Sequence, residues 1–361
     1  MEESKMKVMF IIDFLGYGGA SKMLTEIANN LSLKGFDVKV YGYASNSHHY
    51  NFVAGVEYIQ GSPLHSNYYL RHFLKVPQVI KMIRKIKPNV IISFMPNPNV
   101  LSIIGTRFTN IPVIISERGD PSIFKGIIPK IKYFFYNFAD VLVCQTEGAK
   151  SFFNNRIKRK SIIIPNSVTI QKTQITPIEQ RRKEIAFVGR FQLSQKRQDL
   201  MVLAFKEVVK KHPEYKLVFY GDGDDIEIVK NLVRNEGLSN SVIFAGKVDN
   251  VIDIIKDAGI FVLTSDYEGI PNALIEAMCL GLPVVSTDCS PGGARLLIEN
   301  NINGIIVPRG NVQSIANAVN FLIENPSEAQ KMGANAQNII ERFSPEKICS
   351  LWEKVIKSVI K

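Results

Sequence analysis

Two glutamates stand eight positions apart in the stretch YEGIPNALIEAMCLG, on either side of a predicted helix start. Glu268 precedes the helix, whereas Glu276 lies within it, roughly opposite an apolar stripe that begins at Leu274. Pro271 suits a first helical position and Asn272 suits a cap. Free backbone N–H groups at such a start can hold an anion. The pattern indicates a site for a ligand that carries both hydroxyl and phosphate groups.

Two cations follow another predicted strand, in the stretch FVGRFQLSQKRQD. The strand ends at Gly189, Arg190 follows at once, and Lys196 comes six positions later, at a predicted helix start. Positive charges at the carboxyl end of one strand suit the neutralisation of a diphosphate leaving group. Two solvated surface charges are the alternative that the sequence leaves open.

Glycines follow two further strands. The stretch DFLGYGGAS places Gly16, Gly18 and Gly19 before a helix, where the backbone can approach a phosphate closely. Its spacing is not G-x-G-x-x-G, so a dinucleotide fingerprint is poorly supported and a turn without a ligand stays open. In YGDGDD, Asp222 and Asp224 suggest either a carboxylate pair on a metal–diphosphate or a Gly-Asp-Gly turn, and we favour the turn.

The elements that must position these residues alternate between strand and helix in both halves of the chain. In the first half, the predicted strands span residues 7–13, 38–43, 89–94, 111–117, 140–146 and 161–166. After a polar segment, residues 168–184, which indicates a linker, the predicted strands are EIAFVGR, YKLVFYG, SVIFAG, GIFVLTS, LPVVST and NGIIVP. Such continuous apolar strands are typical of parallel sheets covered on both faces. The sequence predicts two Rossmann-like α/β domains with a ligand cleft between the carboxyl ends of their sheets.

The length of 361 residues suits this division. We expect an N-terminal domain over residues 1–167, a C-terminal domain over 168–344, and a last helix over 345–361 that packs back toward the N-terminal domain. No apolar run approaches the length of a membrane span, and VMFII near the start is too short for a signal peptide, which favours the cytoplasm. The four cysteines form no C-x-x-C pair and no histidine stands beside them at zinc spacing, so we expect no metal site.

The net charge of +11 lies in the first half of the chain. Residues 1–165 hold 21 Lys and Arg against 10 Asp and Glu, whereas residues 166–361 hold 23 of each kind. Residues 71–88 and 123–138 mix basic side chains with Ile, Phe and Tyr, which suits contact with an anionic membrane. Core helices whose lysines extend to water are the alternative. Nucleic-acid binding is disfavoured, because the basic residues are scattered and form no recognition module.

Taken together, these motifs resemble the retaining glycosyltransferases of family 4, whose GT-B fold consists of two Rossmann-like domains. The resemblance covers nearly the whole chain and is strongest over residues 189–308. The shared motifs are Gly-Gly-Ala near the N-terminus, PNSV (165–168), GRF…K (189–196), GDG, FAGKV (244–248) and EGIPNALIEAM.

The resemblance implies a role for each candidate residue. Arg190 and Lys196 match the cations that hold the donor diphosphate, and Glu276 matches the glutamate that binds the ribose hydroxyls. Glu268, with the N–H groups of Gly269, Ile270, Pro271 and Asn272, matches the loop that holds the donor sugar and distal phosphate. Lys247 and Val248 match the base-binding segment, and Gly18 and Gly19 match a loop that touches phosphate or acceptor. Gly189, within GRF…K, is a further candidate for contact with the donor.

Two positions depart from the family pattern. Ser21 stands where many members carry glutamate, and Arg118, in IISERGDP, stands where many carry histidine. A bacterial polysaccharide-assembly branch commonly has this Ser-Glu-Arg sequence. Arg118 could take part in catalysis by binding phosphate or acceptor, or it could form an ion pair with Glu117 or Asp120.

The resemblance implies a transferase that moves a hexose or N-acetylhexosamine from a nucleotide-sugar, expected to be a UDP-sugar, to a lipid-linked or polysaccharide-precursor acceptor. It implies no metal and no cofactor beyond the donor itself. With the basic half as a membrane contact, we expect a peripheral protein on the inner face of the cell membrane. Transfer to a soluble acceptor and an NAD-dependent oxidoreductase are the alternatives.

Overall fold

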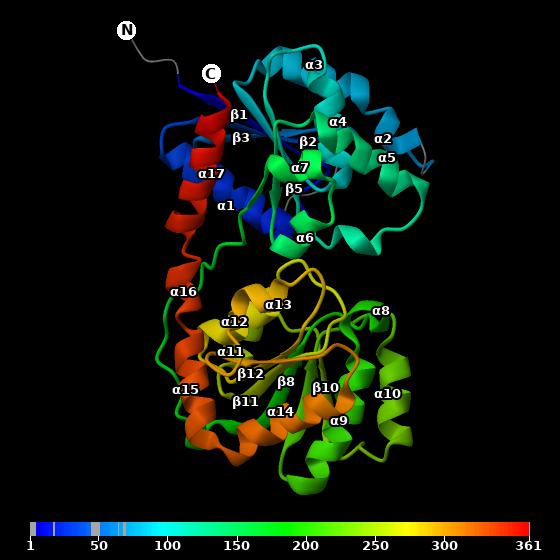
Figure 1. Ribbon diagram of the computed structural model, residues 1–361, viewed down its shortest axis with the longest axis vertical. Helices are drawn as coiled ribbons and strands as arrows, with labels where there is room; N and C mark the ends of the chain where they lie inside the picture. Colours follow the sequence, from blue (N-terminus) through cyan, green and yellow to red (C-terminus); the bar gives the residue numbers. More distant parts are fainter. Residues whose placement is uncertain (1–4, 17–18, 45–50, 64, 68–69, 361) are drawn as a thin grey trace. The chain divides into compact units, whose positions relative to one another are not determined.

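The chain folds into two α/β units. The computed structural model describes residues 5–16, 19–44, 51–63, 65–67 and 70–360. Contacts divide the chain into one unit of Met1–Ser167 with Pro345–Lys361 and a second of Val168–Ser344 (Figure 1). Within each unit, the paired strands of the described residues run parallel. The prediction of two Rossmann-like domains with parallel sheets is confirmed.

In the described part of the first unit, the strands follow the order β3-β2-β1-β4-β5-β6-β7. They are β1 (Lys7–Ile12), β2 (Asp37–Gly42), β3 (Val56–Gln60), β4 (Val90–Phe94), β5 (Val113–Glu117), β6 (Val141–Cys144) and β7 (Ser161–Ile163). The helices are α1 (Gly19–Leu33), α2 (Leu70–Phe73), α3 (Val76–Ile86), α4 (Pro96–Thr106), α5 (Ile127–Phe135), α6 (Glu147–Ser151), α7 (Asn155–Arg159) and α17 (Pro345–Val359), with short 3₁₀ turns η1 (Pro121–Ile123) and η2 (Tyr136–Phe138). Val8 to Ile12 are at most 1% exposed, as expected for a strand covered on both faces.

The described part of the second unit has the order β10-β9-β8-β11-β12-β13. Its strands are β8 (Arg182–Val188), β9 (Lys216–Tyr220), β10 (Val242–Gly246), β11 (Ala258–Leu263), β12 (Val284–Thr287) and β13 (Ile305–Val307). Its helices are α8 (Leu193–Lys196), α9 (Gln198–Lys211), α10 (Ile226–Asn235), α11 (Val251–Ile255), α12 (Asn272–Cys279), α13 (Gly293–Leu297), α14 (Val312–Glu324), α15 (Pro326–Ala336) and α16 (Ile339–Arg342), with the 3₁₀ turn η3 (Ile178–Gln180). The predicted linker extends too far, because β8 already begins at Arg182.

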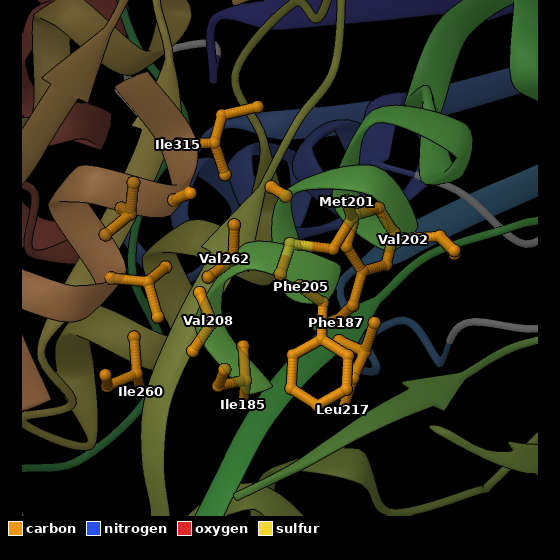
Figure 2. Packing of buried hydrophobic residues seen from close by; sticks show 14 of the residues in the cluster. Ile185, Phe187, Met201, Val202, Phe205, Val208, Leu217, Ile260, Val262 and Ile315 are labelled. Atoms are coloured by element: carbon orange, nitrogen blue, oxygen red, sulfur yellow. The ribbon is translucent and has the colours of Figure 1, made fainter. Parts of the chain in front are cut away.

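The core of the second unit packs α9 and α14 against the sheet (Figure 2). Met201 and Phe205 of α9 meet Phe187 of β8 and Leu217 of β9, and Ile315 of α14 closes the cluster. Full burial of one such side chain stabilises the fold by roughly 1.5–3 kcal/mol. This core holds β8 and β11 side by side, and both strands lead directly into candidate site residues.

Each sheet has a switch point at which the chain changes direction across the sheet. β1 lies between β2 and β4, and β8 lies between β9 and β11. Ligands of open α/β sheets bind outside the carboxyl ends of the strands at such points. The candidate residues after β8 and β11 therefore meet at the switch point of the second sheet.

The C-terminal helix α17 belongs to the first unit. Glu353 accepts a hydrogen bond at 2.6 Å from Lys34, the residue that follows α1. Trp352, the only tryptophan of the sequence, is fully buried and stacks on Phe94 at the end of β4, with 5.5 Å between the ring centroids. Among the described residues, no helix is long and apolar enough to span a bilayer.

Candidate functional site

A buried ion pair lies at the switch point of the second sheet. Lys196 is the last residue of α8, and Glu268 lies in the loop after β11. Lys196 Nζ lies 2.5 Å from Glu268 Oε1, although the two residues are 72 positions apart in the sequence. Their side chains are 18% and 10% exposed. Lys196 is therefore not the solvated surface charge of the alternative interpretation.

Polar neighbours fix the Glu268 carboxylate. Ser265 donates its hydroxyl to Oε1 at 2.8 Å, and the Gln195 amide donates to Oε2 at 3.3 Å. The same amide donates to the carbonyl of Tyr267 at 3.2 Å. Sequence analysis missed Gln195 and Ser265. The available signal was the polar pair Thr264–Ser265 at the end of an otherwise apolar strand, because polar side chains at a strand's carboxyl end face the ligand edge of the sheet.

The backbone that carries Lys196 is held as firmly as its side chain. Thr264 donates to the carbonyls of Lys196 and Arg197 at 2.9 and 2.8 Å. Arg197 adopts a left-handed conformation with φ of 53° and hydrogen-bonds to Asp199 and Asp266. These two carboxylates raise the pKa of its guanidinium. The bonds tie the α8–α9 junction to the end of β11, so the ammonium of Lys196 stays at the switch point.

Arg190 is the second residue after β8 and is exposed. A Cβ atom added to Gly189 would lie 3.6 Å from the aliphatic stem of Lys196, so this stem lies close to the end of the strand that precedes Arg190. A Cβ atom on Gly221 would lie 2.1 Å from the carbonyl oxygen of Gly189, which explains the glycine there. The amide of Gly223 donates to the Asp222 carboxylate at 2.8 Å. Gly221 to Gly223 are irregular, and the turn lies at Asp224 and Asp225, directly before α10.

The loop after Glu268 leads into the N-terminus of α12. The helix begins at Asn272, with Pro271 in the capping position, one residue from the predicted boundary. Gly269 packs tightly against the start of α13. A Cβ atom on Gly293 would lie only 2.1 Å from the carbonyl oxygen of Gly269. Ile270 is 7% exposed and anchors the loop. Sequence analysis missed Gly293, although the Gly-Gly pair in SPGGA was a signal for close backbone approach.

Glu276 lies on the second turn of α12 and is half-buried. The predicted apolar stripe of this helix is confirmed, since Leu274, Ala277 and Met278 are fully buried. The stripe fixes the rotation of α12 and therefore sets the direction of Glu276.

Lys247 and Val248 follow β10, the outer strand of the second sheet, two strands away from β8. Lys247 is exposed and Val248 half-buried. Among the described residues, no hydrogen bond or ion pair joins them to the Lys196–Glu268 pair. Also within the described residues, no group of three or more His, Cys, Asp or Glu side chains could hold a metal ion.

Three of the predicted site residues, Gly18, Gly19 and Arg118, come from the N-terminal half of the chain. Gly19 is the first residue of α1, and Gly18 lies outside the described residues. Arg118 follows β5 and is 9% exposed. No carboxylate of the described residues forms an ion pair with it, so the pairing with Glu117 or Asp120 does not form. Glu117 instead accepts a hydrogen bond from the Tyr136 hydroxyl at 2.9 Å, and burial raises the pKa of its carboxyl to about 7.

Comparisons with known proteins agree with this geometry. Residues 17–172 match the model of Glycosyltransferase Family 4, and residues 169–339 match that of glycosyl transferases group 1. An "uncharacterized glycosyltransferase" of Haemophilus influenzae is 25% identical over 96% of this chain and 98% of its own length.

A relative from Campylobacter jejuni is 26% identical over 98% of this chain and 99% of its own length. It is the GalNAc-alpha-(1->4)-GalNAc-alpha-(1->3)-diNAcBac-PP-undecaprenol alpha-1,4-N-acetyl-D-galactosaminyltransferase. Among solved structures, Anabaena Alr3699/HepE in complex with UDP superposes with a TM-score of 0.81 at 20% identity, over 98% of this chain and all of that one.

Proposed function

We propose that this chain, a glycosyltransferase of the GT-B type, transfers a hexose or N-acetylhexosamine from a UDP-sugar to a lipid-linked or polysaccharide-precursor acceptor, with retention of the anomeric configuration. The type follows from the two family matches, because the chain joins a glycosyltransferase family 4 domain to a glycosyl transferases group 1 domain on two Rossmann-like units. We further propose that the first unit binds the acceptor and the second the donor. The proposal includes no resident metal or cofactor.

The buried Lys196–Glu268 pair carries the proposal for the donor site. A lysine at the carboxyl end of the sheet, beside exposed Arg190, supplies positive charge where a departing diphosphate would need it. The N-terminus of α12 lies at the end of the same loop, and the positive end of its helix dipole favours an anion. Glu268 then holds donor-sugar hydroxyls from one side of the diphosphate, and Glu276 holds ribose hydroxyls from the other.

The mechanism follows from positioning and charge. Retention in this proposal arises from attack by the acceptor hydroxyl on the face that the diphosphate leaves. The anomeric carbon–oxygen bond to the diphosphate breaks, the bond to the acceptor oxygen forms, and the departing phosphate takes the acceptor's proton. Lys196 and Arg190 stabilise the charge that develops on the phosphate oxygens.

Two observations support UDP and a lipid-linked acceptor. The Anabaena neighbour carries UDP in its crystal structure, and the Campylobacter relative acts on a glycan joined to undecaprenol by a diphosphate. In the second unit, Lys247 and Val248 at the end of β10 are the proposed contact for the base.

Glu276→Ala should abolish stabilisation by the donor, because the ribose hydroxyls lose their acceptor. The measurement is the melting temperature with UDP-, GDP-, ADP- and CMP-sugars and with NAD. We expect UDP-sugars to raise the melting temperature of the wild type and of the exposed-glutamate control Glu324→Ala, but not that of Glu276→Ala. Stabilisation by NAD alone would identify an oxidoreductase and overturn the proposal.

The acceptor side of the proposal rests on the α5 surface, defined as Ile123, Phe124, Ile127, Ile128, Ile131, Phe134 and Phe138. None of the residues of α5 is buried, and Ile127 and Phe134 are 71% and 61% exposed. Lys125 and Lys130 are exposed beside them. No acidic residue occurs between positions 121 and 139. An apolar surface with only positive charge around it fits an anionic membrane, where a lipid-linked acceptor resides.

The second basic segment of the sequence is different. In α3, Val79, Ile83 and Ile86 are buried and the helix packs on α4, so its apolar side chains form core. Lys75, before α3, is 3% exposed and donates to the carbonyl oxygens of Ser62 and Pro63. For α3 the alternative of a core helix with exposed lysines is therefore the correct one, and the membrane proposal rests on α5.

Replacing Ile127, Ile131 and Phe134 together by serine should weaken binding to phosphatidylglycerol vesicles at least tenfold, because their apolar area no longer enters the bilayer. Cosedimentation measures binding, with pure phosphatidylcholine vesicles as the charge control. The matched control replaces Ile228, Ile243 and Ile254, exposed residues of the second unit, by serine. Equal binding of both triple variants would contradict the α5 surface as the anchor. No vesicle binding by the wild type would favour a soluble acceptor.

A further inference from the structure

Arg118 is a buried cation that forms no ion pair with any of the described residues. Its side chain is 9% exposed, and burial lowers its pKa to about 9. Among the described residues, its Nε atom has no hydrogen-bond partner. A buried charge normally requires an opposite charge, because its removal from water is costly. The buried carboxyl of Glu117 offsets the effect of burial on the Arg118 pKa only in part and makes no ion pair with it.

Asn166 bonds to the Arg118 guanidinium, and Gln145 holds Asn166 in turn. Arg118 Nη2 donates to Asn166 Oδ1, and Gln145 Nε2 donates to the same oxygen at 2.7 Å. Gln145 and Asn166 are 3% and 7% exposed. The Oε1 atom of Gln145 also has no partner among the described residues. Among the described residues, the side chains that hydrogen-bond to the guanidinium are therefore neutral.

The three residues come from three adjacent strand ends. Arg118 follows β5, Gln145 follows β6, and Asn166 follows β7 by a few residues. These strands are parallel neighbours, so their carboxyl ends lie at one edge of the first sheet. That edge is where open α/β sheets bind ligands. An unpaired arginine there is placed for an anion, because a guanidinium binds phosphate oxygens in a geometry that few other groups match.

We propose that Arg118 forms an anion subsite of the first unit, which takes a phosphate or diphosphate group of a substrate, and that Asn166 and Gln145 are its positioning residues. The inference deepens the proposed function and rests on it, because the transferase would have two sources of such a group. One is the diphosphate of the donor, and the other is a diphosphate that links the acceptor to its lipid.

The only tryptophan provides a readout that does not depend on activity. Arg118 lies over the ring of Phe94, with 5.3 Å between Cζ and the ring centroid, and Trp352 stacks on Phe94. An anion on Arg118 should therefore change the fluorescence of Trp352. Inorganic pyrophosphate, UDP and farnesyl diphosphate are the probes, each titrated into the full-length protein.

Pyrophosphate should change the wild-type fluorescence in a saturable way, and Arg118→Gln should weaken its binding at least tenfold. Asn166→Asp is the second variant, because it gives Arg118 an internal carboxylate at nearly unchanged size. If the cluster is an anion subsite, Asn166→Asp should keep or raise the melting temperature and still weaken pyrophosphate binding tenfold. A purely structural cluster predicts unchanged affinity.

The other two probes distinguish the sources. Weaker UDP binding with unchanged farnesyl diphosphate binding in Arg118→Gln assigns the subsite to the donor, and the reverse assigns it to the acceptor. Unchanged affinities for all three probes in both variants, with the fold intact, would overturn the proposal. An incorrect donor-site proposal can be told apart from an incorrect Arg118 proposal. It would show in the Glu276→Ala melting experiment, whereas the pyrophosphate titration followed by Trp352 fluorescence would be unaffected.

Discussion

Lys196→Met should lower turnover with the nucleotide-sugar by about 100- to 1,000-fold, the usual loss when one preorganised donor to a developing negative charge is removed. The ammonium is held at the switch point by its ion pair with Glu268, and the Thr264 hydroxyl bonds to the backbone carbonyl of Lys196. Release of UDP from the donor, with a bacterial lipid fraction as the source of acceptor, reports turnover. Calorimetric titration should show UDP binding weakened about 10- to 100-fold, as for a lost hydrogen bond to a charged group.

A second variant separates chemistry from stability. Lys196→Met alone leaves Glu268, whose side chain is 10% exposed, without its ion-pair partner, so the free energy of unfolding should also fall. The double variant Lys196→Met/Glu268→Gln removes both charges and should recover stability without recovering turnover. Lys206→Met, which breaks a partly exposed pair with Glu236 in the same unit, should change stability little and leave turnover intact. Wild-type turnover in the Lys196 variant would rule out the assigned role.

Glu117→Gln should make the first unit less sensitive to pH between about 5 and 8. Burial raises the pKa of this carboxyl to about 7, and Tyr136, Arg118 and Lys132 act in the opposite direction only in part. The folded state therefore holds a proton that the unfolded chain has released above its pKa of 4.5. This contribution to stability is complete below pH 4.5 and is lost as the pH rises through 7. The free energy of unfolding should therefore fall by about 3 kcal/mol in total over this pH range, at about 1.4 kcal/mol per pKa unit.

Trp352 gives a probe of the first unit alone for this experiment. Urea unfolding of wild type and Glu117→Gln, followed by its fluorescence at pH 5 and pH 8, should show the variant relatively more stable at the higher pH. The amide of the variant can still accept the Tyr136 hydrogen bond. Glu147→Gln, an exposed glutamate after the adjacent strand β6, is the matched control and should follow the wild type. Parallel pH profiles of wild type and Glu117→Gln would contradict a proton on Glu117.

Local patterns predicted most of the fold. β11 is apolar along its whole length, and β1 is apolar after Lys7, because helices cover both faces of a parallel sheet. Such runs are visible without any structure. The strand β3 (Val56–Gln60) was not predicted. It lies at the edge of its sheet with half-exposed and exposed residues, so its apolar signal is diluted by Glu57 and Gln60.

The two basic segments show where local patterns fail. Both α3 and α5 combine lysines with large apolar residues, and the sequence gives no reason to treat them differently. Only packing separates them, since α3 buries its apolar side chains on α4 while α5 leaves its own exposed. Burial depends on which element lies opposite, and that is a property of the tertiary structure.

The sequence by itself determined the two-domain parallel architecture, the order of the motifs and the chemical types of the donor-site residues. These follow from periodicity and from spacing within single elements. Only the tertiary structure decided that Lys196 pairs with Glu268 and that Arg118 bonds to Asn166, 72 and 48 positions apart. Parallel strands place distant segments at one sheet edge, and contacts across strand ends depend on strand order and register, which local patterns do not encode.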